Sequence, residues 1–301
     1  MPDPSSLSEL LRDWRERTTF PDVSTELRCG VSGGADSLAL IALGVAAGCR
    51  VTAVHVDHGQ RPTGPQEATL VADACAEIGA AFESATLEVD PGSNLEARMR
   101  AARYKVLGPD AATGHTADDQ AETMMINLLR GAGLRGLGAM TPGPRRPILS
   151  LRRSDTVEVC RRLDWMPFED PSNEDPSFLR NRIRHEVMPL LEDVAGRDVV
   201  PLLVRSAEHA RTASDELVRQ ARELDPTDAR IVSAAPTPVA ALALQMWVRE
   251  VTGDEHPIDA AAIARALQVA AGEALAAEVS GGWRISRSQQ RLSITASADR
   301  Q

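Results

Sequence analysis

The segment Glu26–Leu40 reads E-L-R-C-G-V-S-G-G-A-D-S-L-A-L and predicts a strand, a glycine turn and a helix in immediate succession. Leu27–Val31 is a short apolar run typical of a buried strand, and Leu38–Ala47 is apolar and long enough for a helix. The turn between them, Ser32–Ser37, contains two adjacent glycines, which let an anion approach the backbone closely. Its amide groups and the helix dipole favour phosphate. The segment therefore predicts a polyphosphate cradle, and a plain turn with a serine or aspartate N-cap is the alternative.

The string S-G-G-A-D-S directly after a strand resembles the signature of the PP-loop ATP pyrophosphatases, which cleave ATP between its α and β phosphates. This resemblance implies that ATP is bound by Ser32, Gly33, Gly34, Ala35, Asp36 and Ser37, and that Asp36 holds Mg²⁺. Lys105 is the single lysine of the chain and stands in no G-K-S/T context, which excludes a Walker A loop. The turn after the first strand also lacks G-x-G-x-x-G, so a dinucleotide fold of that kind is not expected.

Length and composition narrow the class of protein. The chain has 301 residues, 43% of them hydrophobic, which is enough for two domains with real cores. Its net charge of -10 argues against a generally basic nucleic-acid binder and leaves room for local basic patches. The four cysteines form no C-x-x-C pair, so we expect reduced, mostly buried thiols. No apolar run approaches the ~20 residues that span a bilayer. No signal-peptide core is found, and we expect a cytoplasmic protein without membrane contact.

Strand patterns alternate with helix patterns through the first half of the chain. Further strands are predicted at 50–56, 81–89 and 110–114, and helices at 65–79, 94–107 and from 118 onward. This alternation predicts an α/β fold with a doubly wound, mostly parallel sheet. We expect a PP-loop catalytic domain at 1–195, a helical connector at 196–225 and a small, largely helical C-terminal domain at 226–301. The Pro-, Ala- and Asp-rich segment 225–238 marks the boundary of the C-terminal domain. This domain is expected to end in a hairpin formed by residues 283–286 and 291–295.

Polar residues follow two of the predicted strands, where open α/β sheets build their sites. His58 lies in H-V-D-H-G-Q-R after the second strand and is expected to contact the nucleotide, an ordinary polar loop being the alternative. His115, Asp119 and Glu122 follow the fourth strand at i, i+4 and i+7, on one face of a helix start. A histidine with two carboxylates can bind magnesium, hold an ammonium group or move a proton. Acids favoured by the helix dipole are the alternative.

Arginines gather in three places. Arg98 and Arg103 lie on the helix 94–107 and could face phosphates or form a solvated face. Residues 130–162 carry eight arginines and two acids, which gives a local net charge of +6. This charge indicates a polyanionic partner, and a solvated run of charges is the alternative. The glycine-rich part of it, 130–138, predicts a mobile loop. A helix is predicted from Ser177 as N-cap to Pro189 as its end, with two arginines on one face.

The order of motifs resembles the tRNA(Ile)-lysidine synthases over roughly residues 26–190. The motifs are S-G-G-A-D-S, H-V-D-H-G-Q-R, N-L-E-A-R-M-R-A-A-R-Y, G-H-T-A-D-D-Q-A-E-T, L-L-R-G-A-G-L-R-G-L, D-P-S-N and R-N-R-I-R-H. The C-terminal part resembles the family's small tRNA-contacting domain only loosely. The resemblance implies an ATP- and Mg²⁺-dependent ligase acting on isoleucine tRNA with a CAU anticodon. The wobble cytidine O2 attacks the α-phosphate of ATP, and the ε-amine of free L-lysine then displaces AMP from C2, giving lysidine.

The resemblance also implies roles for the residues singled out above. Arg98 or Arg103 would stabilise the transferring phosphoryl group, and His115, Asp119 and Glu122 would position or deprotonate the lysine amine, or orient the cytidine. Residues expected to contact tRNA are Arg130, Arg135, Arg180, Asn181 and Arg184. A homodimer is compatible with the family. Two rival readings are a tRNA thiolase, which in most cases needs paired cysteines, and a nucleotide-binding sensor, which would leave the acids and arginines without a purpose.

Overall fold

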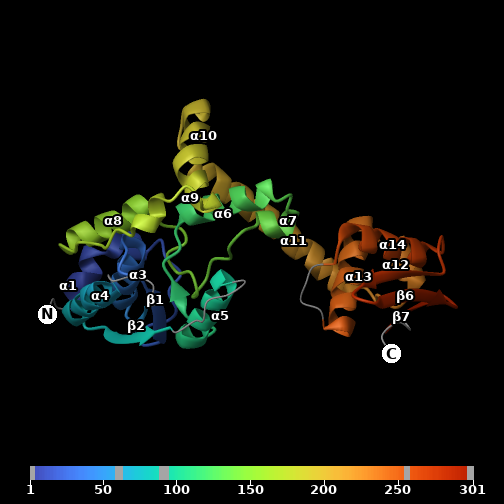
Figure 1. The fold of residues 1–301 in the computed structure, drawn as a ribbon, viewed down its shortest axis with the longest axis horizontal. Coiled ribbons are helices and arrows are strands. Elements are labelled where there is room, and N and C mark those ends of the chain that lie inside the picture. Colours follow the sequence, from blue (N-terminus) through green and yellow to red (C-terminus); the bar gives the residue numbers. More distant parts are fainter. Residues whose placement is uncertain (1–3, 58–63, 88–94, 254–257, 297–301) are drawn as a thin grey trace. The chain divides into compact units, whose positions relative to one another are not determined.

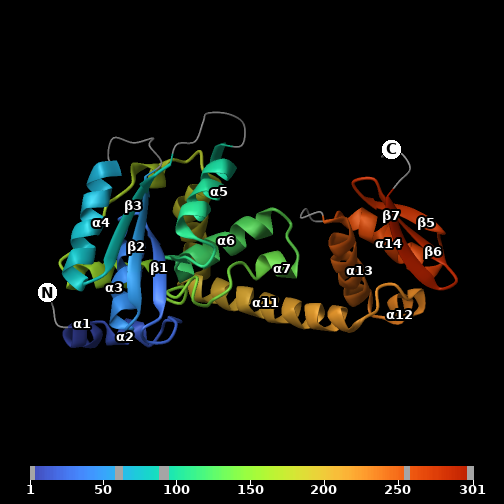
Figure 2. The same ribbon diagram turned by 90° about the horizontal axis from the view of Figure 1, so that it is seen from below.

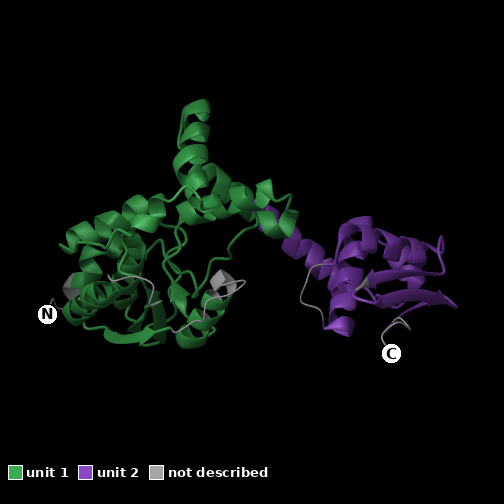
Figure 3. Ribbon diagram, in the orientation of Figure 1, with its two compact units in different colours: residues 1–208 green, residues 209–301 purple. Residues whose placement is uncertain are grey.

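The computed structural model describes residues 4–57, 64–87, 95–253 and 258–296. The chain divides into two compact units, Met1–Glu208 and His209–Gln301 (Figure 3). The division falls within the long helix α11 (Val200–Glu223). The helical connector predicted at 196–225 covers the residues of this helix.

The first unit is built on a parallel sheet with the strand order β3-β2-β1-β4. Its strands are β1 (Glu26–Val31), β2 (Arg50–Asp57), β3 (Ala81–Thr86) and β4 (Ala112–Thr113). In the register, Leu27 lies opposite Val51 and Val31 lies opposite His55. All the pairings are parallel, which confirms the predicted sheet, although β3 and β4 are shorter than their sequence patterns indicated.

Helices cover both faces of this sheet (Figures 1 and 2). The helices before β4 are α1 (Pro4–Leu10), α2 (Arg12–Arg15), α3 (Ala35–Ala46), α4 (Gly64–Ile78) and α5 (Leu95–Leu107). Helices α1, α3 and α4 share one core with Leu27, Val31 and Val51, whereas α5 places Leu107 against Val54 on the other face. Figure 2 shows α4 and α5 on opposite sides of the strands. The doubly wound prediction is therefore confirmed.

Helix α3 is buried on nearly all sides, which fixes the turn that precedes it. The side chains of residues 38–43 have no measurable exposure, because the sheet, α1 and α8 (Arg153–Arg162) surround them. A helix that is apolar all round must be enclosed in this way. Burial of each leucine side chain contributes about 1.5–3 kcal/mol, so the start of α3 is held rigidly against the sheet.

The segment after β4 contains more helix than the sequence indicated. It forms α6 (Ala117–Leu129), α7 (Leu134–Leu137), α8, the 3-10 turn η1 (Pro171–Glu174), α9 (Leu179–Arg182), the π-helical turn η2 (Ile183–Val187) and α10 (Met188–Ala195). The prediction of a loop throughout 130–138 was wrong, because α7 forms within it. The Asn127 amide donates to the Gly136 carbonyl at 2.7 Å, and this bond ties the short helix to α6.

The predicted helix from Ser177 to Pro189 was wrong at both ends. Phe178 occupies the N-cap of α9, and the Ser177 amide donates instead to the Asp175 carboxylate. Pro189 does not end the helix but lies in the first turn of α10, where a missing N–H is tolerated. The five-residue π-helical turn directly before it accommodates this junction. Figure 1 shows α10 projecting away from the sheet of its own unit.

The second unit combines helices with an antiparallel sheet. Its elements are α12 (Ala229–Ala234), α13 (Thr237–Thr252), α14 (Ala260–Ala271), β5 (Ala276–Ser280), β6 (Trp283–Ser288) and β7 (Arg291–Ala296). The predicted hairpin is confirmed as β6 and β7, and β5 pairs with β6 as a further strand. Helix α12, capped by the Asp228 carboxylate, lies within the segment 225–238 that was predicted as a boundary.

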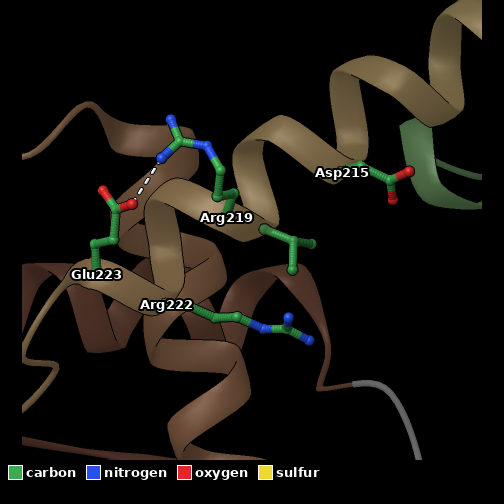
Figure 4. A pocket seen from close by; sticks show the side chains of 5 residues that line it. Asp215, Arg219, Arg222 and Glu223 are labelled. Atoms are coloured by element: carbon green, nitrogen blue, oxygen red, sulfur yellow. Dashed lines mark hydrogen bonds and ion pairs between the residues drawn. The ribbon is translucent and has the colours of Figure 1, made fainter.

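A shallow pocket lies on the part of α11 that belongs to the second unit (Figure 4). Its lining residues are Asp215, Val218, Arg219, Arg222 and Glu223. Arg219 forms ion pairs with Glu223 at 2.6 Å and with Glu216 at 2.7 Å. No helix within the described ranges is both long and apolar enough to cross a membrane.

A phosphate cradle beside an acid–arginine cluster

The predicted cradle is a turn that joins β1 to α3. Gly33 has a φ of +84°, which a residue with a side chain rarely adopts, and Gly34 occupies the N-cap of α3 in an extended conformation. The Ser37 hydroxyl accepts the Ser32 amide at 3.2 Å and donates to the Gly34 carbonyl at 2.9 Å. Ser37 therefore closes the turn on itself. No side chain of the described residues caps α3, so its first amides are the donors that an anion would meet.

Two other parts of the first unit contact the cradle: the chain that follows α8, and helix α4. The Phe168 amide, which follows α8, donates to the Gly33 carbonyl at 2.9 Å. A Cβ at position 33 would lie 3.6 Å from the Cβ of Phe168 and 3.7 Å from a methyl group of Leu70 on α4. The turn is therefore in contact with α4 and with the chain after α8, and its shape is set before any ligand binds.

Asp36 lies in the first turn of α3, beside the cradle. The Thr156 hydroxyl of α8 donates to Asp36 Oδ1, and Arg153 Nε lies 3.7 Å from Asp36 Oδ2. Burial raises the pKa of Asp36 to about 6, the nearby Asp119 charge adds to the increase, and the contacts from Thr156 and Arg153 oppose it. Burial thus disfavours the charged form of this carboxylate, and a bound cation would stabilise that form.

Asp119 and Glu122 lie one helical turn apart at the start of α6. Asp119 Oδ2 accepts the Thr116 amide at 2.8 Å and the Thr116 hydroxyl at 3.2 Å, so this carboxylate caps the helix. Glu122 is 2% exposed. Two carboxylates buried this close to each other need cationic partners, since an unpaired buried charge costs several kcal/mol.

Three guanidinium groups supply those partners. Arg153 Nη2 lies 3.0 Å from Asp119 Oδ1 and 3.3 Å from Glu122 Oε1. Arg180 contacts the same two acids at 3.0 and 2.9 Å. Arg184 Nε lies 2.8 Å from Glu122 Oε1, and its Nη2 lies 3.6 Å from Asp119 Oδ1. Burial by itself would raise the pKa of Asp119, but Arg180 and Arg153 outweigh it, and the pKa lies below its ordinary value.

These six side chains form what we call the acid–arginine cluster: Asp36, Asp119, Glu122, Arg153, Arg180 and Arg184. Its three acids and three arginines balance in formal charge. The cluster joins the start of α3, where the cradle lies, to the start of α6. A cationic ligand that enters the cluster would compete with the guanidinium groups for the carboxylates. An anionic ligand would bind to the guanidinium groups.

His115 lies just before α6 and next to the cluster. Its Nδ1 is 2.7 Å from the Thr113 hydroxyl. Burial lowers the pKa of His115, the guanidinium groups of Arg146, Arg180 and Arg103 lower it further, and the Asp119 charge opposes them. The imidazole is therefore neutral near pH 7, so it can accept a proton.

The structure brings some of the predicted residues together and separates others. Asp36, Asp119 and Glu122 meet in the cluster, with His115 beside them. The Arg103 side chain extends from α5 to strand β1. Its Nη2 would be 3.7 Å from a Cβ added to Gly30. Other predicted residues lie outside the cluster: Arg98 is exposed on α5, Arg130 and Arg135 are exposed at the end of α6 and on α7, and His58 lies outside the described residues.

The residues predicted to contact tRNA on α9 and η2 have intramolecular partners in this structure. Arg180 and Arg184 pair with the buried acids. The Asn181 side chain is buried and donates to the carbonyls of Ser172 and Asp175 at 2.8 and 2.9 Å, which fixes the acidic turn before α9. Their contact with tRNA stays a prediction.

Sequence reasoning missed two residues of this site, Arg153 and Thr156. Both lie in the first turn and a half of α8. The sequence showed them only as part of an arginine-rich segment, because no local pattern indicates that α8 docks against the start of α3.

The side chains around the cradle suit Mg²⁺ better than thiol chemistry. No group of three or more His, Cys, Asp or Glu side chains within the described ranges could hold a metal by itself. Asp36 offers one carboxylate beside the cradle, which fits Mg²⁺ that arrives on phosphates, because Mg²⁺ commonly uses one or two protein carboxylates in such sites. All four cysteines are buried, and burial raises the pKa of Cys75 to about 11 and of Cys160 to about 12, which makes them poor nucleophiles.

The chain is similar to known proteins over most of its length. A family model described as a PP-loop domain matches residues 6–191. The tRNA(Ile)-lysidine synthase of Nocardia farcinica (strain IFM 10152) is 38% identical over 270 residues, 84% of each chain. The tRNA(Ile)-lysidine synthase of Rhodococcus erythropolis (strain PR4 / NBRC 100887) is 36% identical and covers 82% of this chain and 81% of its own length.

A solved structure supports the fold alone. The U34-tRNA thiolase NcsA from Methanococcus maripaludis, solved with its [4Fe-4S] cluster, superposes with a TM-score of 0.55 at 19% identity. The superposition covers 69% of this chain and 80% of the thiolase. The two proteins therefore share the arrangement of sheet and helices, and the similarity carries no statement about chemistry.

Proposed function

The chain belongs to the tRNA(Ile)-lysidine synthase family of PP-loop enzymes, ligases that form lysidine in tRNA with ATP, and on that premise we propose a complete reaction for it. It ligates L-lysine to C2 of the wobble cytidine of isoleucine tRNA with a CAU anticodon. The reaction passes through a cytidine adenylylated at O2 and releases pyrophosphate and then AMP.

One observation carries this proposal: an anion cradle and a pair of buried carboxylates lie side by side and are bridged by one guanidinium. The cradle suits the outer phosphates of ATP. The carboxylates Asp119 and Glu122 suit an ammonium group, and Arg153 pairs with both of them and with Asp36 in the cradle turn. A ligase that activates a base with ATP and then attacks it with an amine needs these two sites adjacent to each other.

In the first step the cradle amides hold the leaving pyrophosphate while cytidine O2 attacks the α-phosphate. The new bond joins O2 to phosphorus, and the bond between phosphorus and the bridging α–β oxygen breaks. Mg²⁺ held at Asp36 would supply neutralisation of phosphate charge. Arg103 would face the transferring phosphoryl group, with Arg98 as the further candidate on α5.

In the second step the ε-amine attacks C2, and AMP leaves with the O2 oxygen. An ammonium group has no lone pair, so it must lose a proton first. Asp119 and Glu122 would bind the lysine, and the His115 imidazole, whose pKa is lowered by burial, would accept that proton. Arg180 and Arg184, which pair with the acids in this structure, would then be available to the lysine carboxylate or to phosphates.

The tRNA would approach along the basic segment 130–162. Arg130 and Arg135 are exposed there, beside the exposed side chains of Leu128, Leu129 and Leu134. The wobble base must leave its stack to reach the cluster, and apolar side chains next to arginines are suited to receive an unstacked base. The second unit is proposed as a further tRNA-contacting domain.

The test is mass spectrometry of isoleucine tRNA after incubation with the protein, ATP and L-lysine. We expect a cytidine heavier by one lysyl unit, together with release of AMP that requires both tRNA and lysine. Omission of each substrate in turn is the control. Tight binding of ATP without AMP release, or an unchanged cytidine, would refute the proposal and favour a nucleotide-binding sensor.

A further inference from the structure

Arg153 has a position that no other described residue shares. Its guanidinium forms ion pairs with all three acids of the cluster, at 3.7 Å to Asp36, 3.0 Å to Asp119 and 3.3 Å to Glu122. The ion pairs of Arg180 and Arg184 with the cluster, by contrast, are to Asp119 and Glu122. Arg153 is therefore the side chain that connects the cradle half of the site to the carboxylate half.

Its backbone is anchored independently of these contacts. The Arg153 amide donates to Asp118 Oδ2 at 2.8 Å, and the neighbouring Arg152 donates to both oxygens of the same carboxylate at 3.1 Å. One turn further along α8, the Thr156 hydroxyl donates to Asp36. The start of α8 is thus bonded to the start of α6 through Asp118 and to the start of α3 through Thr156.

We propose that Arg153 is a positioning residue that sets the spacing between the phosphate cradle and the amine-binding carboxylates, acting through Asp36 and Glu122. The inference rests on the proposed function, in which both steps act on one nucleotide: the α-phosphate is transferred to O2, and the amine then attacks the adjacent C2. A displacement of about 1 Å between the two halves would misplace the amine relative to C2 and cost on the order of 10²-fold in rate.

Each half keeps its own supports when Arg153 is changed. The cradle is held by Ser37 and Phe168, and Asp36 retains the hydroxyl of Thr156. The carboxylates retain Arg180 and Arg184. What is lost is the set of direct ion pairs between the two halves, while the backbone of α8 still joins them through Asp118 and Thr156. Arg153→Lys keeps the positive charge, but an ammonium group lacks the planar fork of donors that lets one side chain reach several carboxylates in a fixed geometry.

The experiment measures the two steps separately in Arg153→Lys, with the full chain, tRNA and ATP. Without lysine, we expect single-turnover release of pyrophosphate within threefold of the unaltered protein. With lysine, we expect lysidine formation about 10²-fold slower, with KM for lysine within threefold, so that adenylylated tRNA accumulates. Arg50→Gln is the matched control, because Arg50 is exposed, pairs with Glu26 and lies outside both the cluster and the segment 130–162.

A second variant keeps the test independent of how well the first one folds. Asp118→Asn leaves Arg153 in place and weakens its anchor, so we expect the same split between the two steps at smaller amplitude. Unaltered rates in Arg153→Lys would overturn the proposal. So would a parallel loss in both steps with a raised KM for ATP, because that would show contact with the phosphates. Failure of the unaltered protein to form lysidine would refute the proposed function instead.

Discussion

Gly114 lies directly against the backbone of Asp36. A Cβ at position 114 would be 2.6 Å from the Asp36 carbonyl oxygen and 3.0 Å from the Ser37 amide nitrogen, closer than real atoms approach. The residue after β4 thus touches the first turn of α3, and the absence of a side chain permits the contact. This contact brings His115, the next residue, up to the cradle.

Gly114→Ala is expected to force these two segments apart. Overpacking at such a contact costs about 1–3 kcal/mol, and here the obstacle is backbone, which cannot rotate away. We expect a lower free energy of unfolding by urea and slower release of both pyrophosphate and AMP. Gly133→Ala is the control, since no atom lies within 4 Å of its Cβ position and its φ is −73°. Wild-type stability and turnover in Gly114→Ala would contradict the packing described.

Asp36→Asn is expected to stabilise the ligand-free protein at neutral pH while abolishing AMP formation. The folded pKa of Asp36 is about 6 and its ordinary value is 3.8, so between these values the folded state binds more protons than the unfolded state. Stability from this group therefore falls as pH rises from about 4 to above 6, by at most about 3 kcal/mol. Urea unfolding of both proteins at pH 4 and pH 7.5 checks this. A variant less stable than the unaltered protein at pH 7.5 would show that Asp36 is not strained by burial.

Asp119→Asn should show the opposite dependence. The pKa of Asp119 lies below its ordinary value, so its charge contributes stability above about pH 4, and that contribution is lost as pH falls through the folded pKa. We expect the variant to lose about 3 kcal/mol at pH 7, since a buried ion-pair partner is removed, with a smaller difference in acid. Asp110→Asn, at an exposed position, serves as the control. Equal losses at pH 7 and pH 3 would refute an electrostatic cause.

Arg130→Gln combined with Arg135→Gln tests the approach of tRNA. Each phosphate contact adds about 1 to the magnitude of the slope of the logarithm of the tRNA association constant against the logarithm of salt concentration. We therefore expect the double variant to bind tRNA more weakly, with a slope smaller in magnitude by about 2. Filter binding over a range of salt concentrations measures both quantities. Arg50→Gln removes one charge outside this segment, at a position paired with Glu26, and should leave the slope unchanged. An unaltered slope in the double variant would exclude this surface.

Much of the catalytic fold could be predicted from the sequence because its signals are local. The strand, turn and helix around Ser32–Ser37 are contiguous, and their apolar periodicity is strong. His115, Asp119 and Glu122 follow a strand directly, so their proximity to the cradle could be inferred from the rule that parallel strands end at one edge. These are the residues that the structure brings together.

The remaining features depend on contacts between distant segments. Arg153 reaches Asp119 from 34 residues away, and that contact follows from the docking of α8, which no local pattern encodes. The helix α7 depends on a side-chain bond from Asn127, and β5 is an alanine-containing segment that becomes a strand by pairing with β6. In each of these cases a tertiary partner, and not the intrinsic propensity of the segment, selects the conformation.

The acid–arginine cluster also affects co-translational folding of the first unit. Its members are spread from residue 36 to residue 184, so a nascent chain that has left the ribosome only to residue 150 has Glu122 but none of the three arginines that neutralise it. Burial of that carboxylate is then strongly unfavourable. The start of α6 is therefore expected to stay open during synthesis, and the first unit to close as a whole once α9 and η2 have emerged.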